Sequence, residues 1–157
     1  MTLQPLPAPT LAYFCTLAVT ASRPVTVGSV FGGTRRVIPI AGGTVSGPGL
    51  SGRVLGIGAD WQTLFEHGVA ELDARYAFEL DDGAVIEIRD IGIRHATPDI
   101  LAALTSGADL APDAYYMRTA ARLSTGDARY AWINRTLFVG RSAKRPDLVQ
   151  IDLYAVG

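Results

Sequence analysis

The sequence predicts a mainly β fold, a single antiparallel β-barrel of about nine strands with one short helix. Apolar and polar residues alternate along most of the chain, as expected for strands, and helical spacing is rare. Turn signals recur at about the 8 to 12 residue spacing that is typical of barrels and sandwiches. Many glycines interrupt the apolar segments, so we expect a sheet that closes on itself. A β-sandwich is the alternative.

The first strands lie within the N-terminal third of the chain. Residues 11–19, LAYFCTLAV, form an apolar segment of strand length. Residues 32–52 contain a strand with an expected bulge at Gly42-Gly43 and a turn over Gly47-Pro48-Gly49. Glycine adopts backbone conformations that other residues avoid, so these positions are expected to bend the sheet.

Three consecutive strands are then expected as an antiparallel meander, in DWQTLFE, VAELDARYAFEL and AVIEIRDIGI. Short turns that contain glycine join them, at His67-Gly68 and at Asp81-Asp82-Gly83. Strands joined by such short turns lie side by side and run in opposite directions.

One segment departs from the β pattern and predicts the short helix. Residues 97–107, TPDILAALTSG, offer Thr97 as the N-cap, Pro98 at the first helical position and Gly107 as a stop. The last three strands are expected in AYYMRTAARL, RYAWINRTLFVG and LVQIDLYAV, and the first two of these turn at STGDA.

Length and charge limit the classes of function. The 157 residues suit one domain, residues 10–157, after a proline-containing N-terminal tail at residues 1–9. The chain has 14 basic and 15 acidic residues and no basic run, so no nucleic acid is expected as a partner. No signal peptide is evident, and no apolar stretch approaches the roughly 18 to 20 residues that span a bilayer. We therefore expect a cytoplasmic protein with no membrane partner and with a small organic ligand.

The sequence predicts no metal and no nucleotide cofactor. His67 and His95 are the two histidines, and with the single cysteine, Cys15, they give no zinc-site spacing. Cys15 lies in an apolar strand and is expected to be a packed thiol. The glycine-rich segments VGSVFGG and VLGIGADWQ lack the third glycine and the following helix of a dinucleotide-binding loop.

Candidate site residues follow from the two-residue period of a strand, which puts residues two apart on one face. Four expected strands each group polar side chains in this way: Asp60 with Gln62, Asp73 with Arg75, Tyr116 with Arg118, and Tyr130 with Trp132 and Asn134. If these faces converge inside the barrel, they line a polar cavity with Trp132 as an apolar wall. Alternatively, Asp73 and Arg75 form an exposed pair that contributes well under about 1 kcal/mol, and the aromatic residues are ordinary core residues.

Several segments together resemble an uncharacterised bacterial and fungal family, domain of unknown function 3237, also called uncharacterised protein family 0311. They are RRVIPIAGGTVSGPGLSGRVLGIGADWQ, LDARYAFELDDGAVIEIRDIGIR, YYMRTAARL and YAWINRTLFVG, and the similarity runs from about Leu11 to Val156. The resemblance implies a compact β-barrel and no established general activity. The chain departs from the family pattern in VLGIGADW, where two adjacent glycines are expected before Ala59.

Two functions of different classes fit these residues. The first is an enzyme, independent of metal and nucleotide, with Asp73 or Asp60 as general base and Tyr116 or Tyr130 as proton donor. The remaining residues would bind the substrate, and the arginines would stabilise its developing negative charge: Arg75, Arg118, Trp132, Asn134 and Trp61. Such groups suit isomerase, lyase, cyclase or hydratase chemistry next to a carbonyl.

The second function is a barrel that binds an aromatic or carboxylated metabolite without changing it, so that the same residues only orient the ligand. A third, compatible with either, is an interaction protein whose apolar outer face forms a homodimer contact. Of the first two functions, the sequence favours the enzyme.

Overall fold

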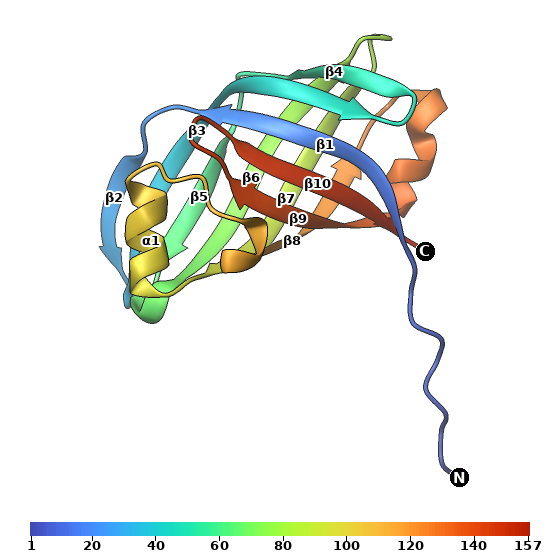
Figure 1. Ribbon diagram of the computed structural model, residues 1–157. Helices are drawn as coiled ribbons and strands as arrows, with labels where there is room; N and C mark the ends of the chain where they lie inside the picture. The colour runs from blue at the N-terminus through green and yellow to red at the C-terminus, as the bar shows by residue number, and fades with distance from the viewer.

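Ten antiparallel β-strands form one sheet that closes into a barrel in the computed structural model, which describes residues 1–157 (Figure 1). The order around the ring is β1-β10-β9-β8-β7-β6-β4-β3, and β3 also pairs with β1, which closes it. The predicted barrel is confirmed. The strands are β1 (Leu11–Ala21), β2 (Val25–Val30), β3 (Gly33–Gly47), β4 (Leu50–Val54), β5 (Ala59–Leu64), β6 (Val69–Leu80), β7 (Val85–His95), β8 (Tyr116–Ser124), β9 (Leu137–Lys144) and β10 (Val149–Val156).

Strands β4 and β5 are successive halves of one position in the ring, because both pair with β3 on one side and β6 on the other. The strand is broken between β4 and β5 at residues 55–58, within the segment that departs from the family pattern. Gly58 has a φ of +81°, and a Cβ there would collide with the Arg75 carbonyl. Glycine is therefore required at this break.

Strand β2 was not predicted, and it brings the number of strands to ten rather than about nine. It pairs with β3 alone, from Val25 opposite Val37 to Val30 opposite Gly33. Glycine-containing VTVGSV has too short and too interrupted an alternation to be distinguished from a loop by pattern.

The predicted helix is confirmed as α1 (Pro98–Thr105), with Thr97 at the N-cap position and Pro98 in the first turn. The Thr97 hydroxyl donates to the Asp99 carboxylate at 2.5 Å and does not cap the backbone. Short 3₁₀ segments are η1 (Glu66–Gly68), η2 (Pro112–Ala114) and η3 (Ala128–Arg135). None of the helices has the length and apolarity needed to cross a membrane.

The sequence predicted a strand through YAWINR, and this prediction is wrong: the segment belongs to η3, and strand β9 begins only at Leu137. The Asp127 carboxylate accepts a hydrogen bond from the Arg129 backbone N–H and so starts the 3₁₀ segment. Ile133 is fully buried and anchors η3 to the core. In Figure 1, η3 and α1 lie at opposite ends of the barrel.

The main core fills the part of the barrel nearest η3. Its largest fully buried side chains include Phe78 on β6, Ile86 and Ile88 on β7, and Phe138 on β9. The Cys15 thiol is fully buried among them, as expected, and burial raises its pKa to about 12. A smaller cluster that includes Leu72, Leu104 and Met117 packs beneath α1 at the other end.

Candidate functional site

A cavity of about 300 Å³ lies inside the barrel, on the side of the core away from η3. This volume is at the lower end of the range for sites that hold small organic molecules. All of the barrel's strand positions contribute to its wall. The lining residues are Val19, Ala21, Ser22, Pro24, Arg36, Ile38, Ile40, Asp60, Gln62, Leu72, Ala74, Tyr76, Asp90, Arg94, Met117, Thr119, Ser142, Lys144, Val149 and Ile151.

The polar part of the wall arises where inward-facing strand positions change from apolar to polar. Along β7 the inward positions are Ile86 and Ile88 in the core, followed by Asp90 and then Arg94 in the cavity. Asp90 and Arg94 thus lie on the same face of β7 as the buried apolar residues. Asp90 is only 2% exposed, so a carboxyl group lies in the interior of the barrel.

Strands β3 and β5 add a hydrogen-bonded chain of side chains to the wall. Arg36 and Gln62 are opposite each other, and the guanidinium Nε and Nη2 donate to Gln62 Oε1 at 2.8 and 2.6 Å. Gln62 Nε2 in turn donates to Asp60 Oδ2 at 2.6 Å, and Asp60 Oδ1 accepts from the Asp73 backbone N–H at 3.1 Å. These bonds orient the amide of Gln62 and hold Asp60 in one position.

Five buried side-chain polar atoms lack a hydrogen-bond partner, and every one of them belongs to a residue of the cavity wall. They are the Tyr76 hydroxyl, Asp90 Oδ1, Arg94 Nε, Thr119 Oγ1 and Ser142 Oγ. A buried polar group without a partner costs about 1 to 3 kcal/mol, so chains rarely keep several in one place without a use for them. These donors and acceptors face a space that a polar ligand can fill.

Burial sets the protonation of the two cavity carboxyl groups. It raises the pKa of Asp90 from 3.8 to about 7, and the charge of Asp60 adds to the rise. The nearby Thr119 hydroxyl opposes this shift, although the two groups do not reach hydrogen-bond geometry. Burial also raises the pKa of Asp60, against the opposing effects of Gln62, the Asp73 N–H and Arg36. Asp90 therefore exchanges its proton near neutral pH.

A phenol and three cations complete the site. Burial, followed by the charge of Asp90, raises the pKa of Tyr76 well above its ordinary value, so its hydroxyl remains protonated and can donate. Burial lowers the pKa of Arg36, Arg94 and Lys144. Three basic side chains thus line the cavity beside two carboxyl groups, Asp60 and Asp90, so basic groups predominate there.

No group of three or more His, Cys, Asp or Glu side chains is arranged to hold a metal ion. The cavity has one pair of carboxyl groups, Asp60 and Asp90, with arginines around it.

Of the predicted site residues, Asp60 and its partner on the same strand face, Gln62, lie in the cavity. Asp73 and Arg75 do share a face of β6, but it is the outer one: Asp73 pairs with Arg89 at 3.4 Å and Arg75 with Glu87 at 2.9 Å, all exposed. The opposite face of the same strand contributes Tyr76 to the interior. The prediction of a buried Asp73–Arg75 pair is wrong, because the other face of β6, with its apolar residues, points into the barrel.

Tyr116, Arg118 and Trp61 also lie outside the cavity. The Arg118 guanidinium stacks 5.3 Å from the ring centre of Tyr116, which is 51% exposed. Trp61 is partly exposed on β5, between the inward-facing Asp60 and Gln62. The prediction that Arg118 shares a cavity with Asp73, Arg75 and Asn134 is therefore wrong.

The remaining predicted residues belong to η3, at the far end of the barrel, and connect it to neighbouring turns. Tyr130 donates to the Asp82 carboxylate at 2.5 Å, and Asn134 exchanges hydrogen bonds with the backbone of Thr125. The Trp132 ring packs against Phe14 and Phe138. These three residues close the barrel end, and do not line the cavity, because a 3₁₀ segment replaces the expected strand.

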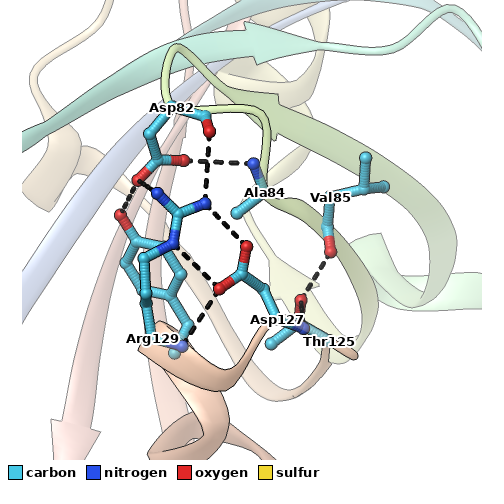
Figure 2. A network of polar contacts seen from close by, with 7 residues as sticks. Asp82, Ala84, Val85, Thr125, Asp127 and Arg129 are labelled. Carbon is cyan, nitrogen blue, oxygen red and sulfur yellow. Dashed lines mark hydrogen bonds and ion pairs between the residues drawn. The ribbon is translucent and has the colours of Figure 1, made fainter.

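Figure 2 shows the polar network that holds η3 against the turn between β6 and β7. Arg129 donates to both oxygens of Asp127, at 3.0 and 2.7 Å, and to the Asp82 carbonyl at 3.1 Å. The Thr125 hydroxyl donates to the Val85 carbonyl at 2.7 Å. Each of these donors has a partner within the protein, so the network has a structural role and holds η3 in place.

The sequence did contain one signal for the residues that were missed. In IEIRDIGIR, Asp90 and Arg94 continue the face of Ile86 and Ile88, so their charged groups follow a buried apolar face. A charge in register with a core face is costly unless it serves a site. No comparable signal marks Arg36, Thr119 or Ser142.

A family model described as a protein of unknown function (DUF3237) matches residues 9–156. A UPF0311 protein of Rhodopseudomonas palustris is 41% identical over 144 residues, which are 92% of this chain and 94% of that protein. A UPF0311 protein of Clostridium acetobutylicum is 37% identical over 141 residues, 89% of each chain.

Solved structures share the fold. A protein of unknown function from Rhodopseudomonas palustris has a TM-score of 0.90 and 39% identity, covering 97% of this chain and 100% of that one. A β-barrel-like protein from Acinetobacter baumannii has a TM-score of 0.82 and 33% identity, with coverages of 99% and 100%. A structure from Penicillium herquei, described as an enzyme, has a TM-score of 0.75 and 19% identity over the full length of both chains.

Proposed function

The chain belongs to the DUF3237 family, and we propose that this member is an acid–base enzyme that acts on a small organic anion inside its barrel. The observation that carries the proposal is the set of five unpartnered buried polar atoms, all on the wall of one cavity. Together their burial without partners costs several kcal/mol, which a bound ligand would offset. The same fold houses a protein described as an enzyme in Penicillium herquei, so the barrel is compatible with catalysis.

Asp90 is the proposed general acid–base group. A pKa of about 7 makes it able both to take and to return a proton at neutral pH, which is where a general base is most effective. Tyr76 would donate its proton in a hydrogen bond to a developing oxyanion, because its own pKa is too high for it to ionise. Asp60 is the second candidate for the base, although its hydrogen bonds to Gln62 and the Asp73 N–H favour a fixed, orienting role.

Arg36 and Arg94 would bind the anionic group of the substrate. Arg94 Nε is buried without a partner, and a guanidinium forms strong paired hydrogen bonds to a carboxylate. An anion held there would place the rest of the molecule against the apolar wall of Leu72, Met117 and Ile151. These roles suit isomerase, lyase, cyclase or hydratase chemistry at a carbon next to a carbonyl group.

The test begins with a thermal-shift screen of carboxylated metabolites, and each hit is then incubated with protein in deuterium oxide. Proton abstraction from carbon appears in NMR spectra as deuterium incorporation, and any product appears beside it. Asp90→Asn is nearly isosteric and should lower the exchange or turnover rate by about 10²- to 10⁴-fold. Asp73→Asn is the matched control, because that carboxylate lies on the outer face, and it should leave the rate unchanged.

A ligand that binds tightly in the cavity, without exchange or product, would identify a binding protein and refute the enzyme proposal. An Asp90→Asn variant that remains folded and turns over at the wild-type rate would refute the role of Asp90.

A further inference from the structure

Lys144 is the chain's single lysine, and it lines the cavity. The other 13 of the 14 basic residues are arginines, including two in the same wall, Arg36 and Arg94. Resting on the proposed function, we propose that Lys144 Nζ forms an imine with a carbonyl carbon of the substrate, so that the substrate class is the oxo acids. An arginine cannot do this, since its guanidinium does not become a free amine near neutral pH.

Two neighbouring elements fix the position of Lys144. It is the last residue of β9, and its backbone N–H donates to the Tyr115 hydroxyl at 2.7 Å. Its Nζ donates to the Leu104 carbonyl near the end of α1 at 2.6 Å. The amine is thus held at the α1 end of the cavity, in a half-buried position that a small ligand can reach.

The surroundings of Lys144 lower the pKa of its amine and so ease the loss of a proton from it. Burial lowers the pKa of Lys144, and the positive charges of Arg94 on β7 and Arg36 on β3 lower it further. Two polar groups accept hydrogen bonds from Lys144. The Tyr115 hydroxyl, just before β8, accepts from the backbone N–H, and the Leu104 carbonyl of α1 accepts from Nζ. A lysine next to other cations in a partly desolvated site is a recognised form of activated amine nucleophile.

The same two arginines would bind the acid group of the ligand. A carboxylate held by Arg94 and Arg36 would present a nearby carbonyl carbon to Lys144 Nζ, because all three residues line the same cavity. The free amine attacks the carbonyl carbon, forming a C–N bond. The nitrogen releases its two protons, the carbonyl oxygen takes up two protons and leaves as water, and a C=N bond to Nζ remains.

The test is reductive trapping. The protein is incubated with pyruvate or with acetoacetate, sodium borohydride is added, and the labelled residue is identified by peptide mass spectrometry. We expect a reduced adduct on Lys144 in most chains, saturating with ligand concentration. The matched variant Lys144→Arg keeps a donor for the Leu104 carbonyl and should leave only labelling at the amino terminus. Arg94→Met should raise the half-saturating ligand concentration by about 10- to 150-fold, as expected for a lost charged hydrogen bond.

Labelling confined to the amino terminus, or equal in wild type and Lys144→Arg, would overturn the inference. So would turnover of an oxo acid at the wild-type rate by a folded Lys144→Arg variant. The inference and the proposed function can fail separately: loss of deuterium exchange in Asp90→Asn without any Lys144 adduct would leave a non-covalent acid–base enzyme.

Discussion

Replacement of Asp90 by asparagine should remove a large pH dependence of folding stability. An unfolded chain releases the Asp90 proton near its ordinary pKa of 3.8, whereas burial raises the folded-state pKa to about 7. Between these values the folded protein binds one more proton than the unfolded chain, so the free energy of unfolding falls as the pH rises. The slope is about 1.4 kcal/mol per pH unit, and the whole window amounts to about 4 kcal/mol.

The expected result is that Asp90→Asn gains stability relative to wild type as the pH rises, by up to about 4 kcal/mol between pH 4 and pH 8. Asparagine keeps the size of the side chain but has no proton to lose, so this contribution disappears. Urea unfolding of both proteins across that range measures the difference directly. The comparison cancels the titrating groups that do not interact with Asp90.

Asp73→Asn is the control for this experiment, because Asp73 is exposed and pairs with Arg89 on the outer face of β6. Its stability should follow the wild-type pH profile. If Asp90→Asn also follows the wild-type profile, Asp90 is not a buried carboxyl group with a raised pKa, and the reasoning about the site is wrong.

Three other variants test the fold and the placement of the site. Ile133→Ala removes the fully buried anchor of η3 and should lower the free energy of unfolding by about 2 to 5 kcal/mol in urea titrations without changing ligand affinity. Gly43→Ala should be destabilising by more than about 2 kcal/mol, because φ is +139° and a Cβ would collide with the Ala18 carbonyl, whereas Gly49→Ala has open space and should cost about 1 kcal/mol. Arg118→Met should leave calorimetric affinity for an anionic ligand unchanged, in contrast to Arg94→Met; a similar loss in both would contradict the placement of the site.

Local signals in the sequence predicted the features that depend on neighbouring residues. The Thr97 and Pro98 start signals and the Gly107 stop define α1 almost to the residue, and the glycine turns at Gly49 and Gly83 lie where the chain reverses. Strand periodicity also paired the correct neighbours, as for Asp60 with Gln62. These predictions succeed because turns, caps and alternation are local.

The site was less predictable because periodicity says which residues share a face, but not which face is inside. Asp73 and Arg75 share a face, as predicted, yet Tyr76 and its partners are the ones that point inward. For Tyr130, Trp132 and Asn134 the strand itself was wrong, since the burial of Ile133 and the Asp127 cap favour a 3₁₀ segment. Which face and which element lie inside depends on tertiary packing.

A crystal structure of the protein with a ligand from the metabolite screen tests the central claim most directly. We predict that the ligand lies inside the barrel, with its anionic group about 2.7 to 3.2 Å from Arg94 Nε and a polar atom at similar distance from Asp90 Oδ1. Those two atoms have no partner in the barrel itself. A ligand bound instead on the outer surface, at Asp73, Arg75 or Arg118, would contradict the claim that the cavity is the functional site.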